Sequence, residues 1–216
     1  MALAYVDFGL DTTAQASSLT MSIADFDAAG APAVSDMARV SAPLSALLTQ
    51  ELDGARQSLG LDIEVLLIAA LGRAIERVVG AGMSMVDVSM SHRPAGLRQL
   101  ALDCVSAREV DATDMLAAVN RTYTEARRGA PAWQSADVLL SCVAVAVRNV
   151  HPELGHALEL HSYRQDGVLQ LDWWYDSRRF DPYTIEELSE QFPLVLIELA
   201  SEATPAGTSG PVVVVS

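Results

Sequence analysis

The sequence of 216 residues predicts an α/β (α+β) fold: a two-layer sandwich in which a mixed β-sheet carries helices on one face. Three observations predict it. Residues 62–78 place apolar side chains at helical spacing, residues 137–147 are an almost wholly apolar run typical of a strand buried on both faces, and residues 157–176 alternate on either side of an Asp-Gly pair. The predicted order of helix, helix, strand, helix, strand, hairpin and helix indicates a mixed sheet.

The chain is predicted to start with an irregular leader, residues 1–36, which is rich in Ala, Ser, Thr, Asp and Gly and lacks a periodic apolar pattern. One short strand is expected within it, near residues 19–23. Organised structure is predicted over residues 37–203, beginning with a short strand at 38–42 and a helix at 45–59 that ends at Gly60.

The second predicted helix begins at Asp62, a good N-cap residue, and ends at Gly80 and Gly82. Alternation then predicts a strand over residues 83–90, and a third helix is predicted over residues 112–128. The strand at residues 137–147 follows it.

A β-hairpin is predicted around Asp166-Gly167, because both central residues of a type I′ turn need positive φ. With a two-residue loop, Gln165 opposes Val168, and the register follows by counting outward. One face of the hairpin is then apolar and faces the core: Leu158, Leu160, Leu169, Leu171, Trp173 and Tyr175. Trp174 lies on the other face and is free to cover a partner or a lipid-like ligand.

On that second face His161 is predicted to lie directly across from Asp172, within reach of a charge-assisted hydrogen bond. The simpler interpretation is a surface cross-strand pair contributing less than about 1 kcal/mol. The alternative is a role at a lobe interface or in a ligand channel.

A long closing helix is predicted over residues 183–203, with a capping box formed by Thr184 and Glu187. Pro193 is expected to kink this helix or break it in two. Residues 204–216 are predicted to be a flexible tail, whose residues 212–215 either add to the sheet as an edge strand or stay disordered.

Composition excludes several classes of function. The net charge of −14 and pI of about 4.5 make nucleic acid and anionic membrane poor partners, and no apolar run is long enough to span a membrane. The absence of lysine excludes Schiff-base chemistry and a phosphate-loop lysine. Cys104 and Cys142 are expected to be free thiols, and no metal site or cofactor is predicted. A cytoplasmic protein with a sizeable core is expected, since half of the residues are hydrophobic.

Four segments together resemble the C-terminal lobe of the condensation domains of nonribosomal peptide synthetases. The first two are Val40-Ser41-Ala42-Pro43-Leu44-Ser45 followed by the apolar helix around Leu66–Ile75, and the strand Val86-Asp87-Val88-Ser89-Met90 leading to His92-Arg93. The other two are Asp137-Val138-Leu139-Leu140-Ser141, and Leu169–Asp176 with Arg178-Arg179-Phe180 and Thr184-Ile185-x-x-Leu188.

The resemblance implies one lobe of the chloramphenicol-acetyltransferase-like acyltransferase fold, whose full members have two lobes and an active site in a tunnel between them. It also implies that the catalytic histidine belongs to a His-His-x-x-x-Asp-Gly motif on the N-terminal lobe. This sequence lacks that lobe, has Leu97-Arg98-Gln99-Leu100 where the family has a glycine–phenylalanine segment, and has Ser141 at an asparagine position. We therefore expect a half-domain that is not catalytic alone.

No residue is predicted to be catalytic. His161 precedes Asp166-Gly167 by a gap one residue too long for the family motif, and the turn explains the Asp-Gly pair. His92 is interpreted as a capping or interface residue, and His151 and His156 as solvated loop residues. Arg178 and Arg179 belong to a mixed-charge connection with Asp176 and Asp181, interpreted as structural or as a docking surface. The predicted interface or ligand-facing residues are His92, Arg93, Ser141, His161, Asp172, Trp174, Arg178 and Arg179.

Three hypotheses follow. The leading one is a non-catalytic assembly or accessory partner in nonribosomal peptide or lipid biosynthesis, which pairs with itself, as a homodimer, or with a separate acyltransferase or synthetase lobe through a flank expected to be apolar. The second is an acyltransferase acting on a carrier-protein-bound acyl thioester, completed by oligomerisation or by an N-terminal lobe supplied in trans. The third is a module that binds a small molecule such as an acyl chain.

Overall fold

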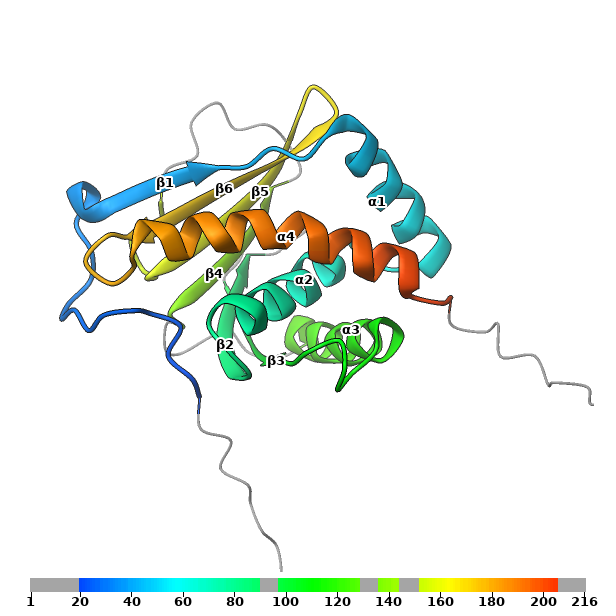
Figure 1. The fold of residues 1–216 in the computed structure, drawn as a ribbon, viewed down its shortest axis with the longest axis horizontal. Coiled ribbons are helices and arrows are strands. Elements are labelled where there is room, and N and C mark those ends of the chain that lie inside the picture. The colour runs from blue at the N-terminus through cyan, green and yellow to red at the C-terminus, as the bar shows by residue number, and fades with distance from the viewer. Residues whose placement is uncertain (1–19, 90–96, 129–135, 144–151, 206–216) are drawn as a thin grey trace, which may run out of the picture.

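The protein is a sheet with helices on one side, as seen in a computed structural model that describes residues 20–89, 97–128, 136–143 and 152–205 (Figure 1). In these residues six strands form one sheet: β1 Met37–Ser41, β2 Gly82–Ser89, β3 Arg98–Cys104, β4 Val138–Val143, β5 Leu158–Gln165 and β6 Val168–Asp176. The helices are α1 Ala46–Leu59, α2 Ile63–Val78, α3 Ala112–Arg128 and α4 Pro182–Glu202. The predicted two-layer α/β fold is confirmed.

The sheet is mixed, as predicted. Its strand order is β1-β6-β5-β4-β2-β3. The β2–β4 and β4–β5 pairs are parallel, whereas β1–β6, β5–β6 and β2–β3 are antiparallel. The parallel strands lie at the centre, which explains why β4 is apolar on both faces: Leu139 and Leu140 are both fully buried. Residues 144–147 of the predicted strand and residues 206–216 of the predicted tail lie outside the described residues.

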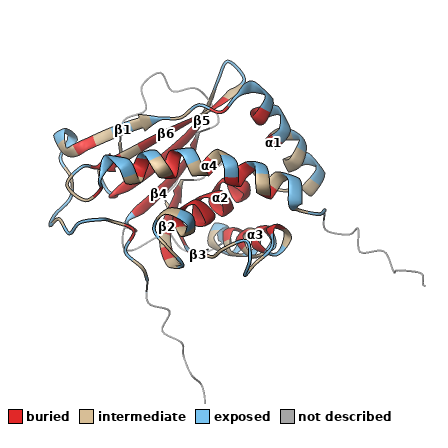
Figure 2. Cartoon of the chain, viewed as in Figure 1, coloured by how far each residue is buried: buried red, intermediate tan, exposed pale blue. Residues whose placement is uncertain are grey.

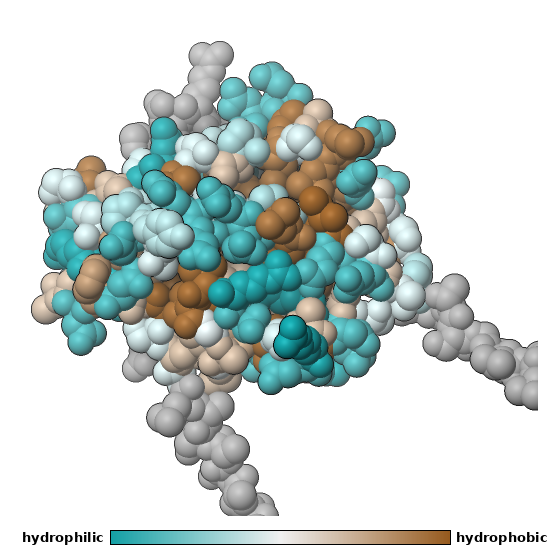
Figure 3. All heavy atoms as spheres, viewed as in Figure 1, coloured by the Kyte–Doolittle hydropathy of each residue, from teal (hydrophilic) through white to brown (hydrophobic). Residues whose placement is uncertain are grey.

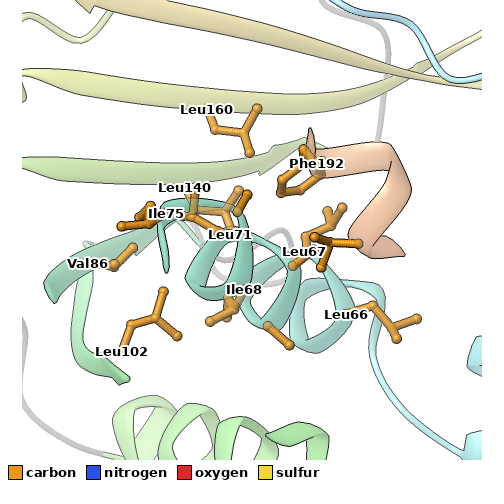
Figure 4. Close-up of a cluster of buried hydrophobic side chains, with 14 of the residues drawn as sticks. Leu66, Leu67, Ile68, Leu71, Ile75, Val86, Leu102, Leu140, Leu160 and Phe192 are labelled. Carbon is orange, nitrogen blue, oxygen red and sulfur yellow. The ribbon is translucent and has the colours of Figure 1, made fainter. Parts of the chain in front are cut away.

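The core lies between the sheet and the helices. Helix α2 runs through its centre, and its residues from Glu64 to Ile75 are all buried, so the helix is covered on every side rather than along one stripe (Figure 2). Its side chains meet those of the strands and of α4, with Leu71 and Ile75 directed towards Val86 and Leu140 (Figure 4). Gly72 permits this packing, because a Cβ there would lie 3.0 Å from the Asp103 carbonyl oxygen of β3.

The helix and turn signals of the sequence are largely confirmed. Ser45 caps α1 by accepting a hydrogen bond from the Leu48 amide at 3.0 Å, and Gly60 ends it in the left-handed conformation. Asp166 and Gly167 have φ of 51° and 82°, and Gln165 pairs with Val168 as predicted. Asp62 occupies the N-cap position of α2 but makes no cap bond; its carboxylate accepts from Arg127 instead.

The structure differs from the predicted elements in a strand that was missed and in the cap of α4. Strand β3 was not predicted, and it forms the edge of the sheet next to β2. The cap of α4 is not Thr184 with Glu187 but Asp181, which accepts from the Tyr183 amide at 2.9 Å, with Pro182 in the first turn. Pro193 was expected to kink α4 or to break it in two; of these two outcomes the break does not occur, since α4 continues through Pro193 as one element.

The described part of the leader, residues 20–36, folds onto the lobe. Ile23 is 2% exposed and belongs to the hydrophobic core, and the Met21 amide donates to the Met83 carbonyl of β2 at 2.8 Å. Of the strand predicted near residues 19–23, the described residues 20–23 form only a bridge, between Thr20 and Met83. Residues 20–36 are therefore part of the lobe surface, and their only helix is one short 3-10 turn at Val34–Asp36.

Candidate functional site

The face of the sheet opposite the helices carries two rows of side chains, which we call the polar sheet face. Strand residues alternate between the faces, so those next to the core residues of each strand point away from the helices. One row crosses five strands: Ser41, Asp172, His161, Ser141 and Ser89 are successive Cα partners. The second row is Arg39, Trp174, Glu159, Leu139, Asp87 and Gln99.

The two rows make this face of the sheet mostly polar. Several of the charged and polar side chains are nevertheless buried: Asp87, Ser141, Glu159, His161 and Asp172 are at most 4% exposed. The large apolar side chains that are exposed lie elsewhere, as in the brown area over α1 and the adjoining part of α4 in Figure 3, where Leu47, Leu194 and Ile197 are exposed.

His161 and Asp172 are Cα partners, as predicted from the hairpin register. The expected hydrogen bond between them does not form. Asp172 instead accepts from the Ser41 hydroxyl at 2.6 Å and from the Tyr163 hydroxyl at 3.0 Å, and lies 3.8 Å from the Arg39 guanidinium. The interpretation as an exposed surface pair was wrong, because each residue is 3% exposed.

The imidazole of His161 pairs with the neighbouring carboxylate on its own strand. His161 Nε2 lies 2.9 Å from Glu159 Oε2, which also accepts from the Glu153 amide at 2.8 Å. When Nε2 donates to the carboxylate, the neutral ring keeps Nδ1 as an acceptor. Such a pair can hold an imidazole in one tautomer and orientation, as a general base requires.

A second buried carboxylate–histidine pair lies at the other end of this face. Asp87 Oδ2 lies 3.0 Å from His156 Nε2 and accepts from the Ala136 backbone amide at 3.0 Å, while Oδ1 accepts from the side-chain Nε2 of Gln99 at 3.2 Å. His156 was interpreted as a solvated loop residue, which is wrong, since it is 4% exposed. In the sequence, the signal for this pair was Asp87, a charged residue between Val86 and Val88 in a central strand, which needs a buried partner.

Three polar atoms of these residues are buried and have no hydrogen-bond partner among the described residues: Glu159 Oε1, His156 Nδ1 and Trp174 Nε1. Glu159 and Trp174 are Cα partners, so an orphaned acceptor and an orphaned donor lie on adjacent strands. Buried groups of this kind are rare in folded proteins, and each requires an explanation. Burial on this face also affects Tyr163, whose pKa is raised by desolvation and by its hydrogen bond to Asp172.

Trp174 points away from the core, as predicted, and the Arg39 guanidinium lies 5.2 Å from its ring centroid. Arg178 and Arg179 lie in the connection from β6 to α4 rather than in either row. Arg178 contacts both oxygens of the buried Asp176, at 2.9 Å from Nε and 2.7 Å from Nη2, and Arg179 pairs with Asp137 at 2.8 Å. These contacts match the structural interpretation of the connection.

Of the other predicted interface residues, Ser141 lies in the first row beside His161. His92 and Arg93 lie outside the described residues. Within the described residues no group of three or more His, Cys, Asp or Glu side chains could hold a metal ion. None of the described helices is long and apolar enough to cross a membrane.

Comparison with known proteins identifies the fold. No family model matches the chain. It is similar to the epimerization domain from the third module of tyrocidine synthetase B, with a TM-score of 0.66 and 12% identity over 86% of this chain and 53% of that one. It is similar to the condensation domain of the Monacolin K polyketide synthase MokA, with a TM-score of 0.66 and 10% identity over 86% and 53%. The chain has the fold of a condensation-domain lobe.

The X-domain from teicoplanin biosynthesis, solved in complex with OxyB, has the same likeness: TM-score 0.67 and 17% identity over 87% of this chain and 50% of that one. The condensation-type lobe described here therefore corresponds to about half of each single domain, as the resemblance to the C-terminal lobe implies.

A sequence relationship adds to the likeness of fold. The chain is 30% identical over 224 residues to one subunit of the phenolphthiocerol/phthiocerol polyketide synthase of Mycobacterium tuberculosis and of Mycobacterium bovis. The match covers 81% of this chain and 15% of those proteins. The condensation-type lobe thus spans a small part of the curated relatives that it matches.

Proposed function

We propose that this condensation-type lobe serves in nonribosomal peptide, polyketide or lipid biosynthesis as an assembly or accessory element, pairing with a second lobe through the polar sheet face. The single observation that carries the proposal is the open end of the polar sheet face at β1, where Arg39 and Ser41 are exposed and Trp174 is partly exposed. A second lobe would pack on these side chains, whereas Glu159 and the other buried groups of the face are already covered within this chain.

The second lobe is either another copy of this chain or a separate acyltransferase or synthetase lobe, and the setting is the cytoplasm. Support for the biosynthetic context comes from the relationship to a polyketide synthase polypeptide and from the condensation-type fold. The X-domain in complex with OxyB offers a precedent for a domain of this fold that binds another protein. With no catalytic residue assigned, the lobe alone is proposed to be inactive.

The test is the solution mass, measured by size exclusion with light scattering at several concentrations. The chain is measured alone and mixed with the part of the mycobacterial polyketide synthase that adjoins the stretch it matches. We expect either twice the 23.0 kDa chain mass or a one-to-one complex. Trp174→Glu, on the polar sheet face, should weaken the association, whereas Leu194→Glu, on the exposed surface of α4, should leave it unchanged. A monomer in both samples, or a complex sensitive only to Leu194→Glu, would contradict the proposal.

A second candidate, an acyltransferase completed by oligomerisation or in trans, is favoured by the His161–Glu159 pair, at 2.9 Å. In it His161 would take the proton from an amine or hydroxyl acceptor as the acceptor attacks the carbonyl carbon of a carrier-bound thioester, and the proton would pass to the carrier thiolate that leaves when the C–S bond breaks. An acyl-N-acetylcysteamine thioester with an amine acceptor tests this. No transfer is expected from the chain alone. Transfer by the assembled complex that is abolished by His161→Gln, with the complex intact, would establish this candidate instead.

A further inference from the structure

An apolar groove runs along the free edge of the sheet, between β3 and α3. Its lining includes Leu100 and Leu102 from the strand, Val110 from the loop that follows, and Met115, Val119 and Thr122 from the helix. The helix residues recur at a spacing of three or four, so they form one face of α3. The groove has a cavity volume of about 90 Å³.

The strand below this groove is the last one in the strand order of the sheet. Among the described residues β3 pairs only with β2, and it is seven residues long. An edge strand presents unpaired amide and carbonyl groups, which another extended segment can pair with. Natural edge strands are commonly covered, so a segment that lies along β3 would complete both the hydrogen bonding and the packing of the groove.

The end of α4 lies beside the start of α3, close to this groove. The Thr204 amide donates to the Thr113 hydroxyl at 3.1 Å, and the two hydroxyls lie 3.2 Å apart. Thr113 is in the first turn of α3, next to the groove residues Val110 and Met115. Figure 1 shows the end of α4 beside α3.

The residues beyond this anchor have the composition of an edge strand. Residues 206–211 are Ala-Gly-Thr-Ser-Gly-Pro and residues 212–215 are four valines, with no charged side chain among them. β-Branched apolar residues favour strands, and an uncharged segment is not repelled by a chain of net charge −14. Six residues span up to about 20 Å, and four extended residues cover about 13 Å. The groove length from Met115 to Thr122 is about 10 Å along the helix.

We propose that Val212–Val215 of this same chain pairs antiparallel with β3 and places alternate valines in the groove. The direction follows from the anchor: the segment enters at the Cys104 end of β3, where Val110 and Thr113 lie, and runs towards Arg98. Docking is intramolecular. It is independent of the polar sheet face, so its failure leaves the proposed function untouched.

Hydrogen–deuterium exchange of peptides covering residues 98–104 tests the proposal in the full chain. Two variants with equal charge are compared, Val213→Asp/Val215→Asp and Val212→Asp/Val214→Asp. Alternate residues of a strand point to opposite faces, so one of these two variants places both of its carboxylates in the groove. In that variant, exchange of the β3 amides that do not pair with β2 should become at least about tenfold faster. The other pair places them outside, with a smaller effect. Exchange in the β5–β6 hairpin should be unchanged in both.

A second pair of variants fills the groove without altering the segment. Ala118→Glu, on the lining of α3, should release β3 as the valine variants do, whereas Ala117→Glu, on the exposed side of the same helix, should not. Equal exchange of residues 98–104 in the parent chain and all four variants would overturn the proposal. Protection that rises with protein concentration would overturn it too, because the segment would then come from another copy.

Discussion

The two faces of this sheet are both buried, but by opposite chemistry. On the helix side, β5 and β6 contribute Leu158, Leu160, Leu171 and Trp173 to one hydrophobic cluster; on the other side the same strands bury Glu159, His161 and Asp172. Apolar burial stabilises at roughly 25 cal/mol per Å². Buried carboxylates gain little net stability, because desolvation offsets their contacts. The difference teaches that low exposure alone does not identify a hydrophobic core, because β5 and β6 bury a polar network equally deeply on the other face.

Adjacent tryptophans give the largest expected effect and the most direct test of this contrast. Trp173 is fully buried on the helix side and contacts Phe192 edge-on at 5.4 Å between centroids. Trp174 is partly exposed on the other face. Trp173→Ala should lower the free energy of unfolding by about 3–5 kcal/mol through the lost contacts and the cavity left behind. Trp174→Ala should lower it by about 1 kcal/mol, mainly through the lost Arg39 contact.

Urea denaturation of both variants measures the difference. The two substitutions remove the same side chain from consecutive positions, so each is the matched control of the other. Equal losses would show that the two faces contribute alike to stability, and the contrast between core and interface would then have to be abandoned.

How far the sequence predicted this contrast depends on how local each cause is. Asp166-Gly167 sets the turn and its loop length, and this was enough to place His161 across from Asp172 and Trp173 opposite in orientation to Trp174. Ser45 and Gly60 each set one end of α1 through hydrogen bonds within a single helical turn. These features need only nearby residues, and they were predicted correctly.

The hydrogen-bond partners on the polar sheet face could not be predicted in the same way. Ser41 is 131 residues from Asp172, and Asp87 is 69 residues from His156. Register places such residues on one face, but rotamers and competing donors decide which carboxylate each histidine contacts. Strand β3 was missed for a related reason: its short alternation of Leu100, Leu102 and Cys104 becomes a strand signal only once β2 is known to lie beside it.

A medium effect is expected from changing the charge of Asp172 while keeping its shape. Asp172→Asn removes a carboxylate that accepts from the hydroxyls of Ser41 and Tyr163, so the free energy of unfolding should fall by about 1–3 kcal/mol. The pKa of Tyr163, raised by burial and by this bond, should move down towards its ordinary value. Ultraviolet titration of the tyrosinate and urea denaturation measure the two effects.

Asp103→Asn is the matched control for that variant, since Asp103 is exposed on the edge strand of the same sheet. Its effect on stability should stay within about 0.5 kcal/mol. If Asp172→Asn is as mild as the control and leaves the Tyr163 titration unchanged, the contacts of Asp172 are not formed in solution.

The smallest expected effect concerns Asp176, the buried carboxylate at the end of β6. Hydrogen bonds from the Arg178 guanidinium hold the pKa of Asp176 below its ordinary value. A depressed folded pKa stabilises fully above the unfolded value of about 3.9, and this contribution is lost as the pH falls through the folded pKa. Because the Arg178 side chain is 34% exposed, solvent screens part of the attraction.

Asp176→Asn should therefore flatten the loss of stability on acidification, measured as the urea midpoint between about pH 6 and pH 3. Arg178→Ala should flatten it as well, because it removes the cause of the lowered pKa, while Glu51→Gln, at an exposed position of α1, should leave the profile unchanged. A parallel acid limb in all of these variants would mean that the Asp176–Arg178 contact adds nothing to stability. In that case the connection between β6 and α4 would be held by the apolar face alone, through Phe180 and Ile185, which are both at most 1% exposed.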